Sequence, residues 1–565
     1  MSTSAQPLAP AAGEDAAHGS RQRRVIFASS LGTLFEWYDF FLAGSLAVPI
    51  SHSIFSGVNP AAAFIFTLLS FAAGFAVRPF GALVFGYVGD VVGRKYTFVV
   101  TVAVMGVSTF VVGLLPGYAQ VGIAAPILFI AMRMLQGLAL GGEYGGAVVY
   151  VAEHVANRQR GEKTAWIQAT AALGLLLSLA VILPTRALLG ETAFTAWGWR
   201  VPFLVSLALL LVSLHIRLKL HESPEFAAMK ADGTVSRAPI SEAFGQWRNV
   251  RVVVLALFGI VMGQAVVWYA SQFYTMFFLT QTLKVDGGTS NLLIVIATIV
   301  TTPFYVLFGK LSDRIGRKPV FLAGCLCAAL FFFPLFKALT HYANPGLELA
   351  QQRAPIIVAA DPADCHFQFN PAGTARFTSS CDVARSAIAR AGLNYVSRSL
   401  PAGATAQIRI GGVQIAAFSA AGPDAAAKAA RLNAAIDDAL KAAGYGVGRA
   451  DPARINKPMT VLVLIVLMLF GTMTYGPIAA MLVELFPSRI RYTALSLPYH
   501  VGIGWFGGFL PAASFAISAA TGDIYSGLWY PVILAAVCFA ICLFFVRESR
   551  HVDIYSTRAE RRAQL

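Results

Sequence analysis

Long apolar stretches recur along almost the whole chain, and they constrain its fold more than any other feature. Hydrophobic residues make up 57% of the 565 residues, and charged residues only 13%. A soluble protein of this length needs a more highly charged surface. Lipid accepts helices with apolar outer faces, because a helix satisfies its own backbone hydrogen bonds. The composition therefore predicts a helical protein that spans a membrane.

Twelve of these stretches are long enough to cross ~30 Å of hydrocarbon as helices. The predicted spans are 25–50, 63–86, 97–116, 124–150, 163–185, 200–219, 251–280, 290–309, 319–340, 458–483, 493–519 and 528–547. Residues 1–24 are polar, and the run that follows them is too long for the apolar core of a signal peptide. We interpret 1–24 as a disordered tail in the cytoplasm.

Basic residues in the connecting segments predict the orientation. The segments on the side of the N-terminal tail are rich in Lys and Arg, whereas the opposite loops carry little beyond Arg186 and Lys284. Cytoplasmic loops have this bias, so we expect both termini in the cytoplasm and the chain in a bacterial inner membrane. The net charge of +15 is spread among short loops rather than gathered in a stripe, which argues against nucleic-acid binding.

A repeated loop divides the spans into two halves. The segment 86–95 (GYVGDVVGRK) follows the second span, and the similar segment 309–318 (GKLSDRIGRK) follows the eighth, 223 positions later. A second repeat, which begins at Glu153 and Glu484, has an offset of 331 positions. Parallel repeats of this kind are typical of two six-helix bundles. The second offset is longer by 108 residues, so we infer an insertion of about that size within 341–457.

The inserted segment has the composition of a small soluble α/β domain. Strands are expected at 355–360 and 407–416, and an amphipathic helix at 423–443. By topology this segment lies outside the cytoplasm, where an oxidising environment permits a disulfide between Cys365 and Cys381. The predicted domains are the tail 1–24, the first bundle 25–220, a cytoplasmic linker 221–250, helices seven to nine in 251–340, the periplasmic insert 341–457, helices ten to twelve in 458–547, and the tail 548–565.

Several motifs resemble those of a known transporter family. The two Gly-x-x-x-Asp-x-x-Gly-Arg-Lys loops are similar to the signature of the major facilitator superfamily. The segments 36–40 (EWYDF), 78–81 (RPFG) and 141–146 (GGEYGG) resemble its metabolite:proton symporter family. The resemblance covers all twelve spans but not the insert. It implies a carrier of a small metabolite such as an organic acid, proline or betaine.

Charged residues inside the spans are costly in lipid, so each is a candidate functional residue. Glu36 and Asp39 share one face of the first span, and two close carboxylates can hold a proton at neutral pH. They are candidates for proton coupling, and an ion pair with Arg78 or Arg133 is the structural alternative. Arg133 can bind a substrate carboxylate bidentately or pair with these acids. Arg78, beside Pro79, is a second candidate for substrate binding, and a structural role at a local bend of the helix is the alternative.

Polar residues in the second half are candidates as well. Gln264, Trp268, Tyr269 and Gln272 share a face of the seventh span and could line a substrate cavity, although such stripes are commonly packing. His500 in the eleventh span could relay a proton or be a satisfied core histidine.

The repeated loops suggest a conformational switch at the cytoplasmic ends of the helices. Close pairs of opposite charge would clamp these ends in one state and separate in the other, and helix capping is the simpler alternative. The pairs are Asp90 with Arg94, Asp313 with Arg317, Glu153 with Arg158, and Glu484 with Arg489 or Arg491.

These observations favour a proton-coupled symporter that imports a small organic acid or zwitterion by alternating access. Its expected partners are the substrate, protons and the lipid bilayer, and we expect a monomer. The sequence contains no phosphate-binding loop of the Gly-x-x-x-x-Gly-Lys-Ser/Thr type, no metal-ligand spacing and no nucleophile motif. We therefore expect no cofactor, no metal and no enzymatic activity. The alternatives are an exporter driven by proton antiport, a sensor of a periplasmic ligand, and an enzymatic insert.

Overall fold

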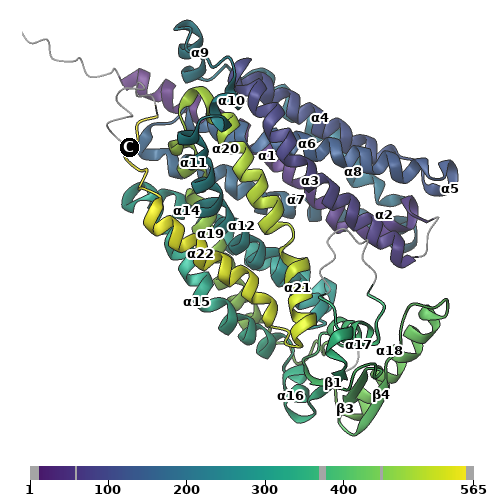
Figure 1. The fold of residues 1–565 in the computed structure, drawn as a ribbon. Helices are drawn as coiled ribbons and strands as arrows, with labels where there is room; N and C mark the ends of the chain where they lie inside the picture. Colours follow the sequence, from purple (N-terminus) through teal and green to yellow (C-terminus); the bar gives the residue numbers. More distant parts are fainter. Residues whose placement is uncertain (1–11, 57–59, 368–376, 446–448, 555–565) are drawn as a thin grey trace, which may run out of the picture.

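The computed structural model describes residues 12–56, 60–367, 377–445 and 449–554, and its helices form two groups (Figure 1). Within these residues, ten helices are long and apolar enough to cross a membrane. Helices α1 and α3, of 34 and 32 residues, lie where the first two spans are expected. The count of twelve spans stays a prediction.

The first group of helices, drawn from purple to blue in Figure 1, forms the first half of the molecule. It consists of α1 (Ala12–Ser45), α2 (Ala47–Ile54), α3 (Pro60–Val91), α4 (Arg94–Leu114), α5 (Tyr118–Val121), α6 (Ala124–Ala152), α7 (Arg160–Ala193) and α8 (Arg200–Leu218). The linker to the second half contains α9 (Pro224–Ala231) and α10 (Pro239–Phe244).

The second half begins with a continuous helical stretch in which α-helical and π-helical turns alternate. This stretch contains α11 (Trp247–Ala256), η3 (Leu257–Val261), α12 (Met262–Tyr269), η4 (Ala270–Tyr274), α13 (Thr275–Phe277) and η5 (Phe278–Thr282). The other long helices are α14 (Gly287–Ile315), α15 (Arg317–Ala343), α19 (Lys457–Leu485), α20 (Arg491–Val501), which continues through η8 (Gly502–Gly507) into α21 (Leu510–Thr521), and α22 (Trp529–Phe545).

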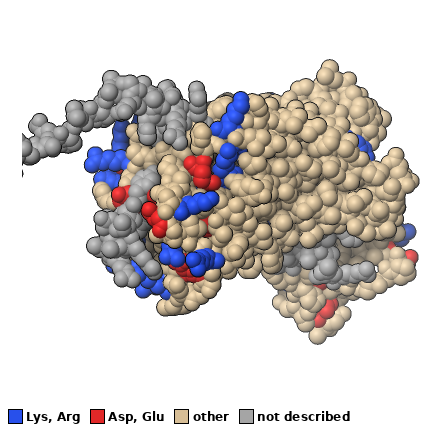
Figure 2. Space-filling model, turned by 90° about the horizontal axis from the view of Figure 1, so that it is seen from above, with Lys and Arg blue, Asp and Glu red and all other residues tan. Residues whose placement is uncertain are grey.

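Charge on the visible face is concentrated at one end of the helices. Figure 2 shows Lys, Arg, Asp and Glu gathered at that end and a broad middle region with almost no charge. The linker helices α9 and α10 lie at the charged end, and the insert lies at the opposite end (Figure 1). An uncharged belt between two polar ends is the surface that a bilayer requires.

Residues between α15 and α19 form a separate α/β unit. Its sheet has the order β2-β1-β3-β4, with β1 parallel to β2 and the other neighbours antiparallel. The expected strand 407–416 is two strands that are joined at Gly411, whose φ of 56° favours glycine. The elements are α16 (Pro345–Arg353), β1 (Ile356–Ala360), α17 (Ser380–Arg390), β2 (Tyr395–Ser399), β3 (Gln407–Ile410), β4 (Val413–Ala416) and α18 (Ala425–Ala442).

Polar contacts attach this unit to the second half. The backbone N–H of Tyr395 donates to the carbonyl of Gly522 (2.7 Å), and that of Ile524 donates to the side chain of Asn394 (2.7 Å). The N–H of Ala450 donates to the carbonyl of Lys284 (2.9 Å). Among the residues that the structure describes, no hydrogen bond or ion pair was found between the unit and the first half. The insert is therefore anchored to the loops η5–α14 and α21–α22.

Small residues allow α3 and α6 to pack closely in the first half. A Cβ atom at Gly137 would overlap the carbonyl oxygen of Gly74, and one at Gly141 would overlap that of Arg78. Helices approach this closely in membranes only where their contact residues are small. The glycines of the segment 141–146 therefore serve packing as well as any role in transport.

Replacement of Gly137 by Ala is expected to destabilise the first half, because the added methyl group has no space. The expected cost is about 1–3 kcal/mol, measured as a lower melting temperature of the detergent-purified protein. Gly44→Ala is the matched control, since nothing lies within 4 Å of the added atom. An equal melting temperature for both variants would contradict the packing argument.

Candidate functional site

The first candidate site is a network of buried charges that joins the two halves at the end opposite the insert. Asp90, near the end of α3, pairs with Arg94 at the start of α4 (2.5 Å). The same carboxylate accepts hydrogen bonds from the backbone N–H groups of Thr493 (2.8 Å) and Tyr492 (3.3 Å). A carboxylate at a helix N-terminus satisfies unpaired N–H groups and interacts favourably with the helix dipole. Asp90 thus holds the start of α20 in the other half.

The second copy of the loop makes the reciprocal contact. Asp313 pairs with Arg317 (2.5 Å) and accepts hydrogen bonds from the backbone N–H groups of Gly161 (2.9 Å) and Glu162 (2.8 Å) at the start of α7. Each loop therefore binds the N-terminus of a helix in the opposite half. The two carboxylates therefore cap helices, which was the simpler alternative. Each of them, however, caps a helix of the other half.

Two buried glutamates complete this network. Glu153 at the end of α6 pairs with Arg491 (2.8 Å), and Glu484 in α19 pairs with Arg160 (2.8 Å) and Arg317 (3.2 Å). These side chains are fully buried. Removal of one partner from such a pair costs roughly 3–5 kcal/mol, because it leaves an uncompensated charge. The network therefore holds the two halves together at this end.

Two of the predicted pairings are wrong. Arg158 is exposed and is not the ion-pair partner of Glu153, and Arg489 pairs with Glu242 of the linker (3.0 Å) rather than with Glu484. The arginines that enter the interface lie two positions later, at the first residue of α7 and of α20. Helix geometry turns these first residues inward, whereas Arg158 and Arg489 lie in the preceding turns.

The second candidate site lies where the two halves meet deeper in the helices. Arg78 of α3 is buried, with its guanidinium carbon 4.1 Å from the ring centre of Phe75 and 5.2 Å from that of Phe40. From the second half it interacts with Tyr269 and Tyr499. Arg78 forms no ion pair with a carboxylate in the part of the chain that the structure describes.

Aromatic rings from both halves surround this arginine. Trp37 lies 5.9 Å from Trp268, Phe41 stacks on Phe273 at 5.8 Å, and Trp268 lies 5.6 Å from Tyr475. The rings form a continuous layer across the interface, which we name the central aromatic cluster. It consists of Trp37, Phe40, Phe41, Phe75, Tyr144, Trp268, Tyr269, Phe273, Tyr475 and Tyr499.

The predicted stripe on the seventh span contributes to this cluster in part. Trp268 and Tyr269 belong to it, and the indole N–H of Trp268 donates to the hydroxyl of Tyr305 (2.7 Å). Gln264 is fully buried, and neither atom of its amide has a partner among the described residues. Gln272 lies in the π-helical turn η4, beside Tyr305. Trp268 and Gln272 therefore share Tyr305 as a neighbour, although Gln272 lies in a π-helical turn.

The acidic residues of α1 lie within the first half. Asp39 is adjacent to Arg133 and Thr109. Arg133 donates a hydrogen bond to Gln136, whose amide donates to the Thr109 hydroxyl (2.8 Å). The arrangement places Arg133 in a polar chain with Asp39, which is one of the two roles considered for it. His500 is buried against the ring of Tyr499, and Arg78 is the charged group that acts on it.

The sequence did not identify one further charged residue that belongs to this region, Arg217. Arg217 of α8 forms a bidentate ion pair with Glu143 of α6. Arg217 lies near the end of the predicted sixth span. A charged side chain at that position is expected to reach the membrane surface, so the sequence pattern offered no reason to propose it as a site residue. Its complete burial in the structure marks it as a site residue.

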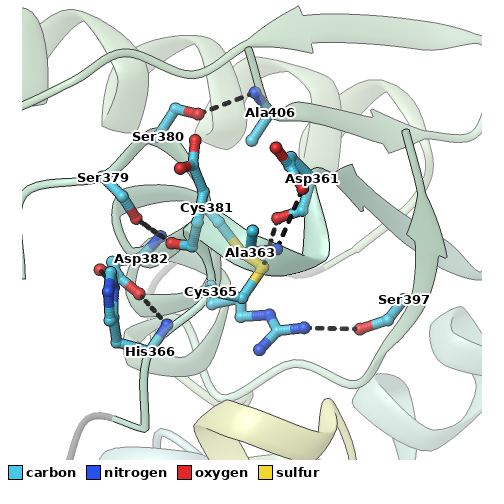
Figure 3. Close-up of a disulfide and its surroundings, with 12 residues drawn as sticks. Asp361, Ala363, Cys365, His366, Ser379, Ser380, Cys381, Asp382, Ser397 and Ala406 are labelled. Carbon is cyan, nitrogen blue, oxygen red and sulfur yellow. Dashed lines mark hydrogen bonds and ion pairs between the residues drawn. A yellow bond between two sulfur atoms is a disulfide. The ribbon is translucent and has the colours of Figure 1, made fainter. Parts of the chain in front are cut away.

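The two cysteines of the insert form a disulfide. Cys365 and Cys381 are bonded, with their Cα atoms 5.1 Å apart (Figure 3). Next to this bond, the Asp382 carboxylate accepts hydrogen bonds from the backbone N–H of His366 and is paired with its ring Nδ1, both at 2.8 Å. The N–H groups of Ala363 and Gly403 donate to Asp361 and lower the pKa of its carboxyl. The disulfide therefore fixes the connection between β1 and α17.

Two models of transporter families match the chain. The Major Facilitator Superfamily model matches residues 29–344, and the Sugar (and other) transporter model matches residues 442–559. The stretch between the two matches lies in the α/β unit.

Curated relatives are named as transporters. The chain is 35% identical to the glycine betaine/proline/ectoine/pipecolic acid transporter OusA of Dickeya dadantii, over 55% of this chain and 63% of the relative. It is 33% identical to the proline/betaine transporter of Escherichia coli K12, over 56% and 64% of the two chains. It is also 35% identical to the E. coli inner membrane metabolite transport protein YhjE, over 58% and 75%. The chain thus spans less than two thirds of the length of the first two relatives.

Solved structures show the same fold. The proton:xylose symporter XylE bound to 6-bromo-6-deoxy-D-glucose superposes with a TM-score of 0.61 at 15% identity, over 96% of this chain and 99% of that chain. An inward-open structure of XylE from E. coli superposes with a TM-score of 0.53 at 15% identity, over 95% and 99%.

Loss of one buried partner in the charge network is expected to open this end of the molecule. In Arg160→Gln, Glu484 keeps only Arg317 and the clamp weakens, whereas Arg158→Gln removes an exposed charge and should have no effect. Spin labels at Val92→Cys and Ile315→Cys, equivalent exposed positions of the two repeated loops, report the separation of the halves by pulsed electron resonance. We expect a population at longer distance in Arg160→Gln alone. An unchanged distribution would show that the network does not hold the halves together.

Proposed function

The chain belongs to the major facilitator superfamily, a family of multi-pass membrane transporters rather than enzymes, and on this premise we propose that it is a proton-coupled symporter. Its substrate would be a small organic acid or zwitterion, imported across the inner membrane by alternating access. The two halves would rock about a central site, with the charge network closing the cytoplasmic end in one state and separating in the other.

The observation that carries this proposal is the environment of Arg78. A buried guanidinium that forms no ion pair among the described residues is costly, and a substrate carboxylate would supply a partner through a bidentate contact. The aromatic faces around it would attract a substrate ammonium group by cation–π interaction. A carboxylate and an ammonium group together describe a zwitterion. Several relatives carry names that include proline and betaine, which are zwitterions.

We propose that the other predicted site residues divide between two tasks. Trp268, Tyr269, Gln264 and Gln272 would shape the substrate site from the second half, and His500 would lie at its edge. Arg133 would neutralise Asp39 rather than bind the substrate directly. Glu36 and Asp39 would form the proton-coupling region.

The proposed topology follows from the charged end of the molecule. We propose twelve spans in a monomer, with both termini and the charge network on the cytoplasmic side. The α/β unit at the opposite end would be a periplasmic domain at 341–457, where a disulfide persists.

Uptake into proteoliposomes with an imposed inward proton gradient tests the proposal. The panel contains labelled glycine betaine, proline, citrate and shikimate. We expect gradient-dependent accumulation of at least one zwitterion, and Arg78→Gln should raise its KM about 10-fold or more, because a hydrogen bond to a charged group contributes about 1.5–3 kcal/mol. Arg186→Gln, which removes an exposed arginine, should transport as the wild type.

Two outcomes would contradict the proposal. The absence of gradient-dependent uptake for the whole panel would argue against symport of these classes. Accumulation only under an outward gradient would instead identify the exporter. An unchanged KM in Arg78→Gln would remove this arginine from the substrate site.

A further inference from the structure

Three charged side chains from different helices meet in the first half. They are Glu36 of α1, Glu143 of α6 and Arg217 of α8, and all three are buried. The guanidinium of Arg217 binds both oxygens of Glu143, with 3.1 Å from Nη1 to Oε2. It also donates to the carbonyl of Phe98 (2.7 Å) and lies on the ring of that residue, 3.4 Å from its centre. The Arg217–Glu143 pair is thus held inside the bundle, away from water.

The structure leaves space between this pair and Glu36. A Cβ atom at Gly32 of α1 would overlap the guanidinium of Arg217, so the absence of a side chain lets Arg217 lie against α1. Glu36 lies one helical turn after Gly32, on the same face of α1. A small cavity of about 20 Å³ is lined by Gly32, Glu36, Asp39 and Glu143, among others, and Arg217 lies beside it against Gly32. A short movement of the Arg217 side chain along α1 would bring it to Glu36.

Several polar atoms at this cavity have no hydrogen-bond partner in the part of the chain that the structure describes. Oε2 of Glu36, Oδ1 of Asp39 and Oγ of Ser213 belong to residues that line it, and Nε of Arg217 lies beside it. Arg217 lies against Gly32, from which Glu36 is one helical turn away and Asp39 almost two. Because buried polar groups are rarely left unsatisfied, the nearer carboxylate, Glu36, is the natural partner of Arg217 in another state of the molecule.

The charges that face Glu36 differ from those that face Asp39. Glu36 interacts with the carboxylates of Glu143 and Asp39 and with the cations Arg78 and Arg217. Asp39 has Arg133 as its counter-charge and Thr109 as a hydrogen-bonding neighbour. Of the two acids, Glu36 is therefore the one on which Arg217 acts, and in this conformation Glu143 holds that arginine in an ion pair.

We propose that Glu36 carries the transported proton and that Arg217 is a positioning residue which moves between Glu143 and Glu36. This inference rests on the proposed symport. When a proton from the outside forms an O–H bond on Glu36, the residue is neutral and Arg217 remains with Glu143. When that proton leaves to the cytoplasm, the Glu36 carboxylate draws Arg217 toward α1 and shares it with Glu143. The proton enters and leaves as H⁺, so no other reactant is required.

Infrared spectroscopy of the reconstituted protein tests the assignment of the proton without a substrate. The absorption of a protonated, buried carboxyl group should titrate with pH in the wild type and in Asp39→Asn, and should be missing in Glu36→Gln. A band that persists in Glu36→Gln would overturn the proposal. Because no transport is measured, this result is independent of the identity of the substrate and of the success of the uptake assay.

Exchange measurements separate coupling from general damage. Glu36→Gln should exchange labelled for unlabelled substrate at a rate near that of the wild type, yet lose at least 10-fold of its gradient-driven accumulation. Glu191→Gln, which removes an exposed carboxylate by the same substitution, is the matched control and should retain accumulation. Loss of accumulation in Asp39→Asn with normal coupling in Glu36→Gln would assign the proton to Asp39 instead.

The role of Arg217 is tested with a charge-neutral double variant. Arg217→Gln with Glu143→Gln removes the pair without leaving either charge unpaired in the bundle. The reference for this double variant is Glu143→Gln alone, in which the carboxylate that repels a charged Glu36 is already absent and Arg217 can pair with Glu36. Without Arg217, the charged form of Glu36 loses this partner, so the pH midpoint of the infrared band should lie about one unit or more above that of Glu143→Gln. A double variant that folds and has the same midpoint as Glu143→Gln would show that Arg217 has a structural role only.

Discussion

The molecule depends on one kind of contact, in which a carboxylate of one half binds the start of a helix in the other half. Asp90 binds the N-terminus of α20, and Asp313 binds that of α7. Each carboxylate is also paired with the arginine four residues later. Because the contacts are reciprocal, the two halves are held at the same end by the same chemistry. The carboxylates and arginines of this network are buried, so a partly open state would leave charges without partners. The fully closed arrangement is therefore favoured over partly open ones.

The closed end determines how the deeper charges can work. With the end at the charge network sealed, the central aromatic cluster and Arg78 would be reached from the opposite side, as alternating access requires in one of its states. The pair Arg217–Glu143 and the acids of α1 lie in the first half alone. In the proposed mechanism, substrate chemistry and proton chemistry would occupy neighbouring but separate volumes. Helix α1 connects these volumes, since Trp37 belongs to the cluster and Glu36 to the acidic region.

The sequence predicted those features that depend on periodicity and repetition. Hydropathy located ten helices that are long and apolar enough to cross a membrane, and the unequal offsets of the two repeats located the α/β unit between α15 and α19. The sequence did not predict features that depend on the position of one or two residues. Arg158 and Arg160 differ in burial because a helix starts between them, and no pattern of charges reveals that boundary. Arg217 was missed because its depth depends on the notch at Gly32.

The attachment of the insert has a mechanical consequence. Its described hydrogen bonds anchor it to the second half alone, through Gly522, Ile524 and Lys284. In the alternating access proposed above, the sheet and α18 would move with that half. Displacement grows with distance from the pivot, so a tilt of a few degrees within the bilayer would become a longer excursion at the far end of α18. The insert would thus carry the movement of the bundle into the compartment that it faces.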